Sequence, residues 1–214
     1  AKLGTKTLVL ETNENGMNTL HGGSLGTGRR HWGISEHTDT SVKLTLSLPD
    51  QTLGLPGPLH LSCKYTITDD ACLILTLTAE SEQNTLCNLA SHPYFCLDNT
   101  GDIRHHSLMI TANHYLPVTD AKIPTGIIKH VAGTSFDYRL PRRLAAIAEE
   151  KESPVDHCFC WEDRDVSLTE TLYEQARLTS HASAIGLTIL SYQPGLQFYT
   201  GHGIKPGIRG HDNR

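Results

Sequence analysis

The chain has 214 residues, of which 38% are hydrophobic and 19% are charged, and its formal net charge is −5. This length can bury a core in one domain, and the composition is globular and not disordered. No run of Lys and Arg exceeds two residues, so the electrostatic footprint of a protein that binds nucleic acid or an anionic membrane is missing. We therefore predict a single domain over residues 1–214 with a small-molecule partner.

The targeting and cysteine patterns predict a cytoplasmic protein with reduced thiols. The sequence contains neither a stretch of about eighteen apolar residues nor a basic start followed by an apolar segment. Its six cysteines include no CxxC pair, and its thirteen histidines form no HExxH or HxH motif. We predict no metal and no cofactor, although Cys158 and Cys160 would share one face of a strand and leave a metal pair open as an alternative.

Alternation of apolar and polar residues dominates the chain and predicts antiparallel strands. The pattern is complete in 42–48, VKLTLSL, and present in the second half of 73–78, LILTLT. Only 141–151 has helical spacing, with a proline suited to a first turn. In chain order the expected strands are 7–11, 42–48, 60–68, 73–78, 107–112, 185–191 and 196–200. This order predicts an all-β sandwich or barrel with one short helix, whose concave face or mouth can hold a ligand.

Four segments combine turn residues and aromatic side chains with a central ionisable or amide group. Each has a structural reading when taken alone: His92 precedes a proline and can end a strand, Asp156 can cap a turn, and Gln197 can be a surface amide of a strand. In chain order the segments are NTLHGG at 18–23, NLASHPYF at 88–95, PVDHCF at 154–159 and PGLQFYTG at 194–201.

These segments resemble those of the aldose 1-epimerases, the galactose mutarotase family, in which an NxLHGG turn, an NHxYF-type turn, a DH segment and a PGxQFYTG strand follow in this order. The family's DI, YLPV, IPTG and GTxFD elements resemble residues 102–103, 115–118, 123–126 and 133–137. The resemblance covers nearly the whole chain. It implies a galactose-mutarotase-like β-sandwich (supersandwich) and interconversion of the α and β anomers of free aldohexoses such as galactose or glucose.

The implied chemistry explains these residue types. A pyranose opens when a base removes the proton of the anomeric hydroxyl and an acid protonates the ring oxygen. A histidine suits the acid because its pKa lies near neutral pH. The resemblance implies that His92 is the catalytic acid and that His21 binds beside the ring oxygen. It also implies that Asp156 accepts hydrogen bonds from sugar hydroxyls and that Gln197 lines the pocket.

The sequence also departs from the family pattern. Ser91 stands where many relatives have asparagine, and Cys96 replaces an asparagine after YF; both changes could alter sugar preference. The family's asparagine-arginine pair before the LHGG turn and its glutamate base after QFYTG have no counterpart, and Glu162, Asp163 and Asp212 lack the family position of that base. We expect a fragment of the epimerase domain, truncated at both ends, with little or no activity.

Several other functions compete with this interpretation. A non-catalytic sugar-binding domain of the same fold would keep His21 and need no base. An enzyme of phosphorylated hexoses would use Arg29 and Arg30. Independently of that alternative, Trp32 would either stack on a sugar or pack in the protein. A metal-binding module and a purely structural interaction domain are the remaining alternatives.

Overall fold

The computed structural model describes residues 1–148, 154–162, 171–204 and 207, and the chain divides into two compact units. The first unit is Ala1–His92 and the second is Pro93–Arg214. Each unit is described by itself below. The predicted single domain stays a prediction.

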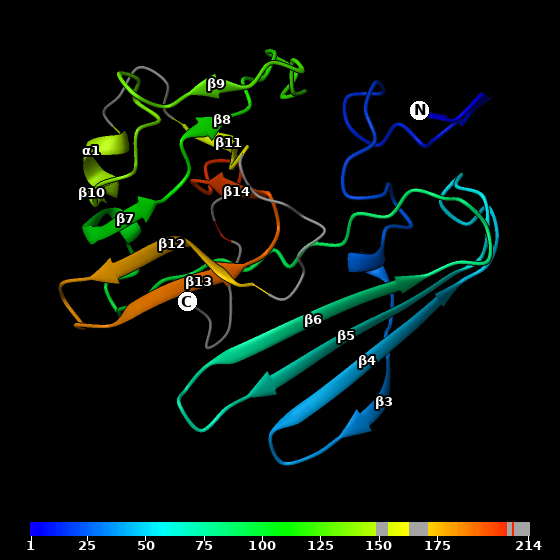
Figure 1. Cartoon of the computed structure of the whole chain (residues 1–214), viewed down its shortest axis with the longest axis horizontal. Helices are drawn as coiled ribbons and strands as arrows, with labels where there is room; N and C mark the ends of the chain where they lie inside the picture. Colours follow the sequence, from blue (N-terminus) through cyan, green and yellow to red (C-terminus); the bar gives the residue numbers. More distant parts are fainter. Residues whose placement is uncertain (149–153, 163–170, 205–206, 208–214) are drawn as a thin grey trace. The chain divides into compact units, whose positions relative to one another are not determined.

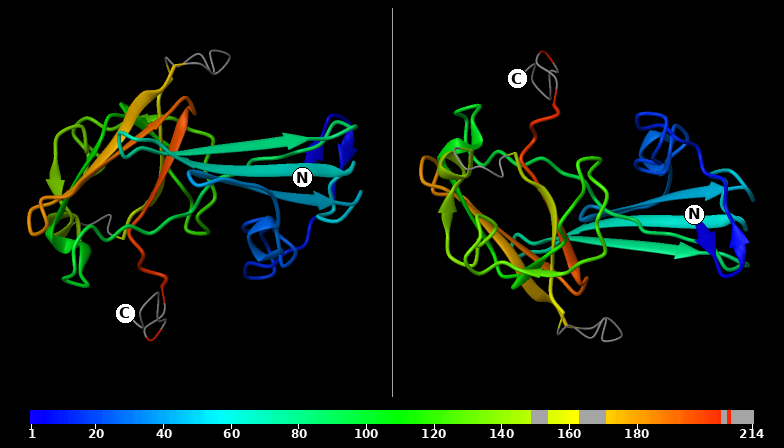
Figure 2. Two further views of the ribbon diagram at one scale, coloured as in Figure 1. Left: turned by 90° about the horizontal axis from the view of Figure 1, so that it is seen from below. Right: turned by 90° about the horizontal axis from the view of Figure 1, so that it is seen from above.

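The first unit is built on a four-stranded antiparallel sheet whose strands follow one another along the chain, in the order β3-β4-β5-β6. The two views of Figure 2 show these strands side by side, coloured from blue to green. The predicted strands 42–48, 60–68 and 73–78 are confirmed as β4, β5 and β6. The elements of this unit are β1 (Lys2–Leu3), β2 (Lys6–Thr7), η1 (Thr27–Arg29), β3 (Gly33–His37), β4 (Ser41–Leu48), β5 (Leu59–Ile67) and β6 (Leu73–Glu80).

A small apolar cluster anchors one end of this sheet. Its buried members are Leu48, Leu59 and Leu61, and the register pairs Leu48 with Leu59 across β4 and β5. Alternate residues of β5 are buried, as expected of a strand with one face covered. Trp32 and Leu89 pack against this cluster, together with Leu46 and Leu53. Residues outside the sheet, on both its N-terminal and C-terminal sides, are thereby fixed to it.

The second unit contains two four-stranded antiparallel sheets, in the orders β10-β7-β12-β13 and β14-β11-β8-β9 (Figure 1). The predicted strands 107–112, 185–191 and 196–200 are confirmed as β7, β13 and β14. The elements are η2 (Ile103–His105), β7 (His106–Ile110), β8 (His114–Tyr115), β9 (Lys129–His130), β10 (Arg142–Arg143), α1 (Leu144–Ala148), β11 (Asp156–Cys160), β12 (Tyr173–Ser180), β13 (Gly186–Ser191) and β14 (Gly195–Tyr199).

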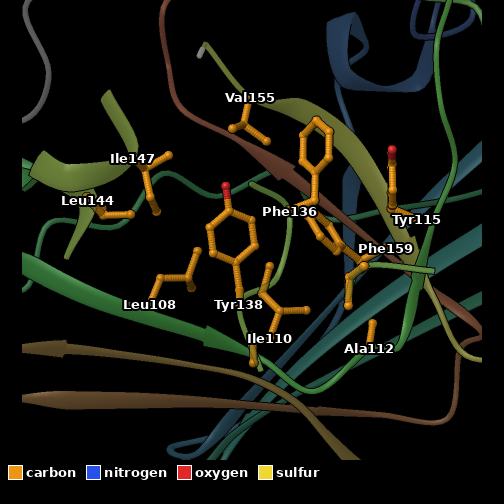
Figure 3. Packing of buried hydrophobic residues seen from close by; sticks show 12 residues of the cluster. Leu108, Ile110, Ala112, Tyr115, Phe136, Tyr138, Leu144, Ile147, Val155 and Phe159 are labelled. Carbon is orange, nitrogen blue, oxygen red and sulfur yellow. The ribbon is translucent and has the colours of Figure 1, made fainter. Parts of the chain in front are cut away.

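The core of the second unit joins both of its sheets. Ile110 and Ala176 come from one sheet, Phe159 comes from the other, and all three are buried in one cluster with Ile147 of α1. Figure 3 shows Tyr138 lying among these side chains, and its ring meets that of Phe159 edge-on with centroids 5.5 Å apart. Two sheets that share a core form a sandwich, so the predicted all-β class is confirmed.

Two expected elements differ from the sequence-based prediction. The strand expected at 7–11 is only the end of the short β1–β2 pair, and Val9 is 87% exposed, so its apolar side chain covers no core. The helix expected at 141–151 begins only at Leu144, because Arg142 and Arg143 pair with β7 as strand β10. Residues 149–153 lie outside the described part of the chain. No helix among the described residues is long and apolar enough to span a membrane.

Candidate active site

His21 lies on a tightly folded loop, residues 20–26, which we call the His21 loop. Three successive residues have left-handed backbone angles: φ is 53° at His21, 79° at Gly22 and 82° at Gly23. The left-handed conformation costs a residue with a Cβ about 1–2 kcal/mol, whereas glycine adopts it freely. The two glycines of the LHGG motif therefore serve the turn, and His21 itself is held in a strained conformation.

The same loop brings the backbone of Gly26 against His21. A Cβ placed on Gly26 would lie 2.1 Å from the carbonyl oxygen of His21. The amide of Gly26 donates to the carbonyl of Gly23 at 3.2 Å, and the amide of Gly23 donates to the carbonyl of Leu20 at 3.0 Å. Consecutive turns of this kind fix where the imidazole of His21 stands.

His92, the predicted catalytic acid, meets His21 within the first unit. The two rings are edge-to-face, with centroids 5.6 Å apart and planes at 78°. His92 lies in a segment without regular secondary structure, and Leu89, three residues earlier, packs against the cluster of Leu48 and Leu59. The structure thus brings together two predicted site residues that are 71 positions apart in the sequence.

Asp156 and Gln197, the other two predicted site residues, meet within the second unit. They lie on the neighbouring strands β11 and β14, where Gln197 is opposite Cys158 and Tyr199 is opposite Asp156. The Nε2 of Gln197 donates to the Oδ1 of Asp156 at 2.8 Å. The carboxylate and the amide therefore share one face of the sheet, with the Oδ2 of Asp156 and the carbonyl oxygen of Gln197 outside this contact.

Aromatic rings flank this polar face. Tyr199 meets Tyr94 at 6.2 Å and His202 at 4.9 Å between ring centroids, and the Tyr199 hydroxyl accepts the amide of Gly203 at 2.6 Å. An apolar ring with a polar tip suits a wet binding surface. Tyr199 therefore borders the pair of Asp156 and Gln197.

His157 takes the opposite face of β11 and is half-buried beside the core residues Tyr115 and Phe136. Its ring lies 4.5 Å from that of Phe136 and 6.1 Å from that of Tyr115, measured between centroids. Burial lowers the pKa of His157, the charge of Lys122 adds to this effect, and Asp156 opposes it. A neutral imidazole among aromatic rings agrees with the structural reading of this residue.

Among the three residues named by the competing hypotheses, Trp32 and Arg30 have side chains with structural contacts. Trp32 packs against the first unit's apolar cluster, and its Nε1 donates to the carbonyl of Thr27 at 3.0 Å. The Nε of Arg30 donates to the carbonyl of Leu25 at 3.0 Å, whereas Arg29 lies at the end of η1. These contacts favour packing for Trp32 and a loop-binding role for Arg30.

Potential metal ligands gather at a place that the sequence did not indicate. Among the described residues, Cys96, Asp98 and His106 form a group with ligand atoms within 4.8 Å of one another, and Cys158 and Cys160 belong to no such group. The Nε2 of His106 accepts the amide of Leu97 at 2.9 Å. The hydroxyl of Ser180 donates to Asp98 at 2.6 Å, and with the Thr100 contacts it lowers the pKa of Asp98 to about 2. These bonds explain the cluster as a turn network.

Two residues that hold the His21 loop were missed in the sequence. The Oε2 of Glu11 accepts the amide of Ser24 at 2.7 Å and its hydroxyl at 2.9 Å. The side chain of Asn13 makes two hydrogen bonds with the backbone of Leu20: its Oδ1 accepts the amide at 2.7 Å, and its Nδ2 donates to the carbonyl at 3.0 Å. Glutamate and asparagine a few residues before a turn are common, so no local signal separates these two from ordinary surface residues.

Known proteins are similar to this chain in sequence and in fold. A family model described as aldose 1-epimerase matches residues 1–213. Aldose 1-epimerase of Escherichia coli (strain K12) is 35% identical over 193 residues, which cover 87% of this chain and 55% of that protein. Galactose mutarotase of Rattus norvegicus is 35% identical over 198 residues, covering 90% of this chain and 55% of that protein. A crystal structure of the GalM/aldose epimerase homologue from C. elegans matches with a TM-score of 0.82 and 30% sequence identity. The match covers 92% of this chain and 59% of the homologue's chain.

The antiparallel sheets and the structural likeness define an all-β protein with the GalM/aldose epimerase fold. The chain belongs to the aldose 1-epimerase family. It spans about half the length of the relatives that it matches.

Proposed function

We propose that this protein interconverts the α and β anomers of a free aldohexose such as galactose or glucose. The observation that carries the proposal is the pairing of His21 with His92, with ring centroids 5.6 Å apart, in a member of the aldose 1-epimerase family. Two adjacent imidazoles offer a proton donor and a second hydrogen-bonding group. Mutarotation needs a proton donor at the ring oxygen of the sugar.

In the proposed reaction, His92 protonates the ring oxygen while a base removes the proton of the anomeric hydroxyl. The bond between C1 and the ring oxygen breaks, an aldehyde forms, and rotation about the C1–C2 bond lets the ring close on the other face. His21 donates a hydrogen bond at the ring oxygen and polarises it. The substrate gains and loses one proton, so no cofactor is required.

Asp156 and Gln197 are proposed to hold the sugar hydroxyls. Their mutual bond of 2.8 Å orients both groups before a ligand arrives. A carboxylate accepts hydrogen bonds from two hydroxyls, and an amide both donates and accepts. Preorientation reduces the cost of ordering these side chains on binding.

None of the described carboxylates is assigned as the base. Asp156 is engaged with Gln197, and the Oε2 of Glu162 lies 3.5 Å from the Nε2 of His114. Asp163 and Asp212 lie outside the described residues. We propose that the 214-residue chain by itself binds aldoses and turns them over slowly.

Polarimetry of freshly dissolved α-galactose and α-glucose tests the catalytic proposal. We expect the chain to equilibrate these sugars more slowly than the Escherichia coli relative, and His92→Gln to remove the remaining acceleration. His37→Gln, at the exposed end of β3, is the matched control and leaves the rate unchanged. A rate equal to that of the relative, abolished by Asp156→Asn, would contradict the assignment of Asp156 to binding.

The alternative is a non-catalytic sugar-binding domain of the same fold. Isothermal titration with galactose together with polarimetry separates the two functions, since a binding domain takes up the sugar without accelerating its equilibration. Lack of binding to both galactose and glucose would contradict either function. The cytoplasmic location stays a prediction.

A further inference from the structure

We propose that Glu11 is a positioning residue that holds the His21 loop in the conformation that binds sugar. The inference rests on the proposed substrate contact of His21 and adds a residue that does not touch the substrate. Its effect would pass through the backbone of residues 20–26. The side-chain contacts of Glu11, Asn13 and Thr19 support this proposal.

The His21 loop needs an external restraint. His21, Gly22 and Gly23 are all left-handed, with φ between 53° and 82°. Two adjacent glycines have more conformational freedom in the unrestrained chain than any other pair of residues. Without a partner outside the loop, this segment would populate several backbone conformations, and the imidazole of His21 would move with them.

Glu11 supplies this restraint on the C-terminal side of His21. One oxygen, Oε2, accepts both the amide and the hydroxyl of Ser24, at 2.7 and 2.9 Å. A Cβ on Gly23 would lie 2.6 Å from the same oxygen, so the carboxylate rests directly against the backbone of the turn. The hydroxyl of Thr19 also donates to the carbonyl of Glu11, at 2.6 Å.

Asn13 supplies a second restraint on the N-terminal side. Its side-chain amide makes two hydrogen bonds with the backbone of Leu20, at 2.7 and 3.0 Å. Asn13 therefore binds the residue before His21, and Glu11 binds the residue three positions after it. Of the two, only Glu11 carries a charge, and a charged acceptor forms the stronger hydrogen bond.

Amide hydrogen exchange tests the restraint without any sugar. We expect Glu11→Ala to accelerate exchange at the Ser24 and Gly23 amides, and Glu11→Gln to have a smaller effect because its carbonyl oxygen still accepts. Glu82→Ala, which removes another exposed glutamate of the same unit, is the control. Unchanged exchange at Ser24 in Glu11→Ala would overturn the proposal.

A double-mutant cycle in galactose binding tests the consequence for function. We expect Glu11→Ala to weaken binding about tenfold, Glu11→Gln to restore part of it, and Glu11→Ala to have no further effect once His21 is alanine. Additive losses would show that Glu11 acts independently of His21 and would overturn the positioning role. If the unmodified chain binds no aldose, the proposed function fails, whereas accelerated exchange at Ser24 would still establish the restraint.

Discussion

Replacing Gly26 with alanine tests how closely the His21 loop is packed. The added Cβ would lie 2.1 Å from the His21 carbonyl oxygen, whereas ordinary contact begins at 3.4 Å. The carbonyl must therefore withdraw by roughly 1.3 Å, the difference between these distances. The backbone angles at Gly26, φ −54° and ψ 156°, suit alanine, so the clash alone produces the effect.

We expect Gly26→Ala to lower the free energy of unfolding by about 1–3 kcal/mol, as overpacking does elsewhere. Galactose binding should weaken about tenfold because His21 moves with its carbonyl. Urea denaturation and isothermal titration measure the two effects. Gly28→Ala is the matched control, since nothing lies within 4 Å of its added Cβ. If the two variants are equally stable and bind equally well, the described packing of the loop is wrong.

Three further variants test the core, the turn network and the sugar-binding face. Phe159→Ala should lower the free energy of unfolding by about 3–5 kcal/mol, because Phe159 is 1% exposed, whereas the exposed Phe95→Ala should cost less than about 1 kcal/mol; equal losses in thermal unfolding would contradict the core assignment. Asp98→Asn should destabilise the chain at pH 7, and the difference in stability from the unmodified chain should shrink as pH falls from about 4 toward 2. The pKa of Asp98 in the folded state is about 2, below the ordinary value of 3.8. The stabilisation by ionised Asp98 is therefore present above pH 3.8 and is lost as pH falls through that window. A difference independent of pH would refute this linkage. Gln197→Leu removes the 2.8 Å bond to Asp156 and should weaken galactose binding about tenfold with little change in melting temperature; unaltered affinity would exclude Gln197 from the site.

Sequence pattern predicted β4, β5 and β6, because apolar and polar residues alternate along much of each strand. In β5, Leu59, Leu61 and Cys63 alternate with more exposed residues, and the alternation is visible in the letters. β12 was missed, because its sequence, YEQARLTS, mixes charged and apolar residues without strict alternation. A bulge between Glu174 and Ala176 shifts its register and explains the broken pattern.

The candidate site was predicted by residue identity and only partly by geometry. Motif resemblance named His21, His92, Asp156 and Gln197, and the structure places them as two contacting pairs. The supporting role of Glu11 could not be predicted, because its partner Ser24 is 13 residues away along a loop. Hydrogen bonds across irregular segments depend on the folded path of the chain and leave no periodic trace in the sequence.

The pairing of β11 with β14 has a practical consequence for protein engineering. Gln197 is opposite Cys158, and the next residue, Phe198, is opposite the half-buried His157. Since neighbouring side chains point to opposite sides, inserting one residue into β14 before Gln197 would exchange an amide for a phenyl ring on the polar face. Reporter tags and linkers therefore belong in the hairpin between β12 and β13, between the exposed residues His181 and Ala182, and a length change there leaves the β11–β14 register intact.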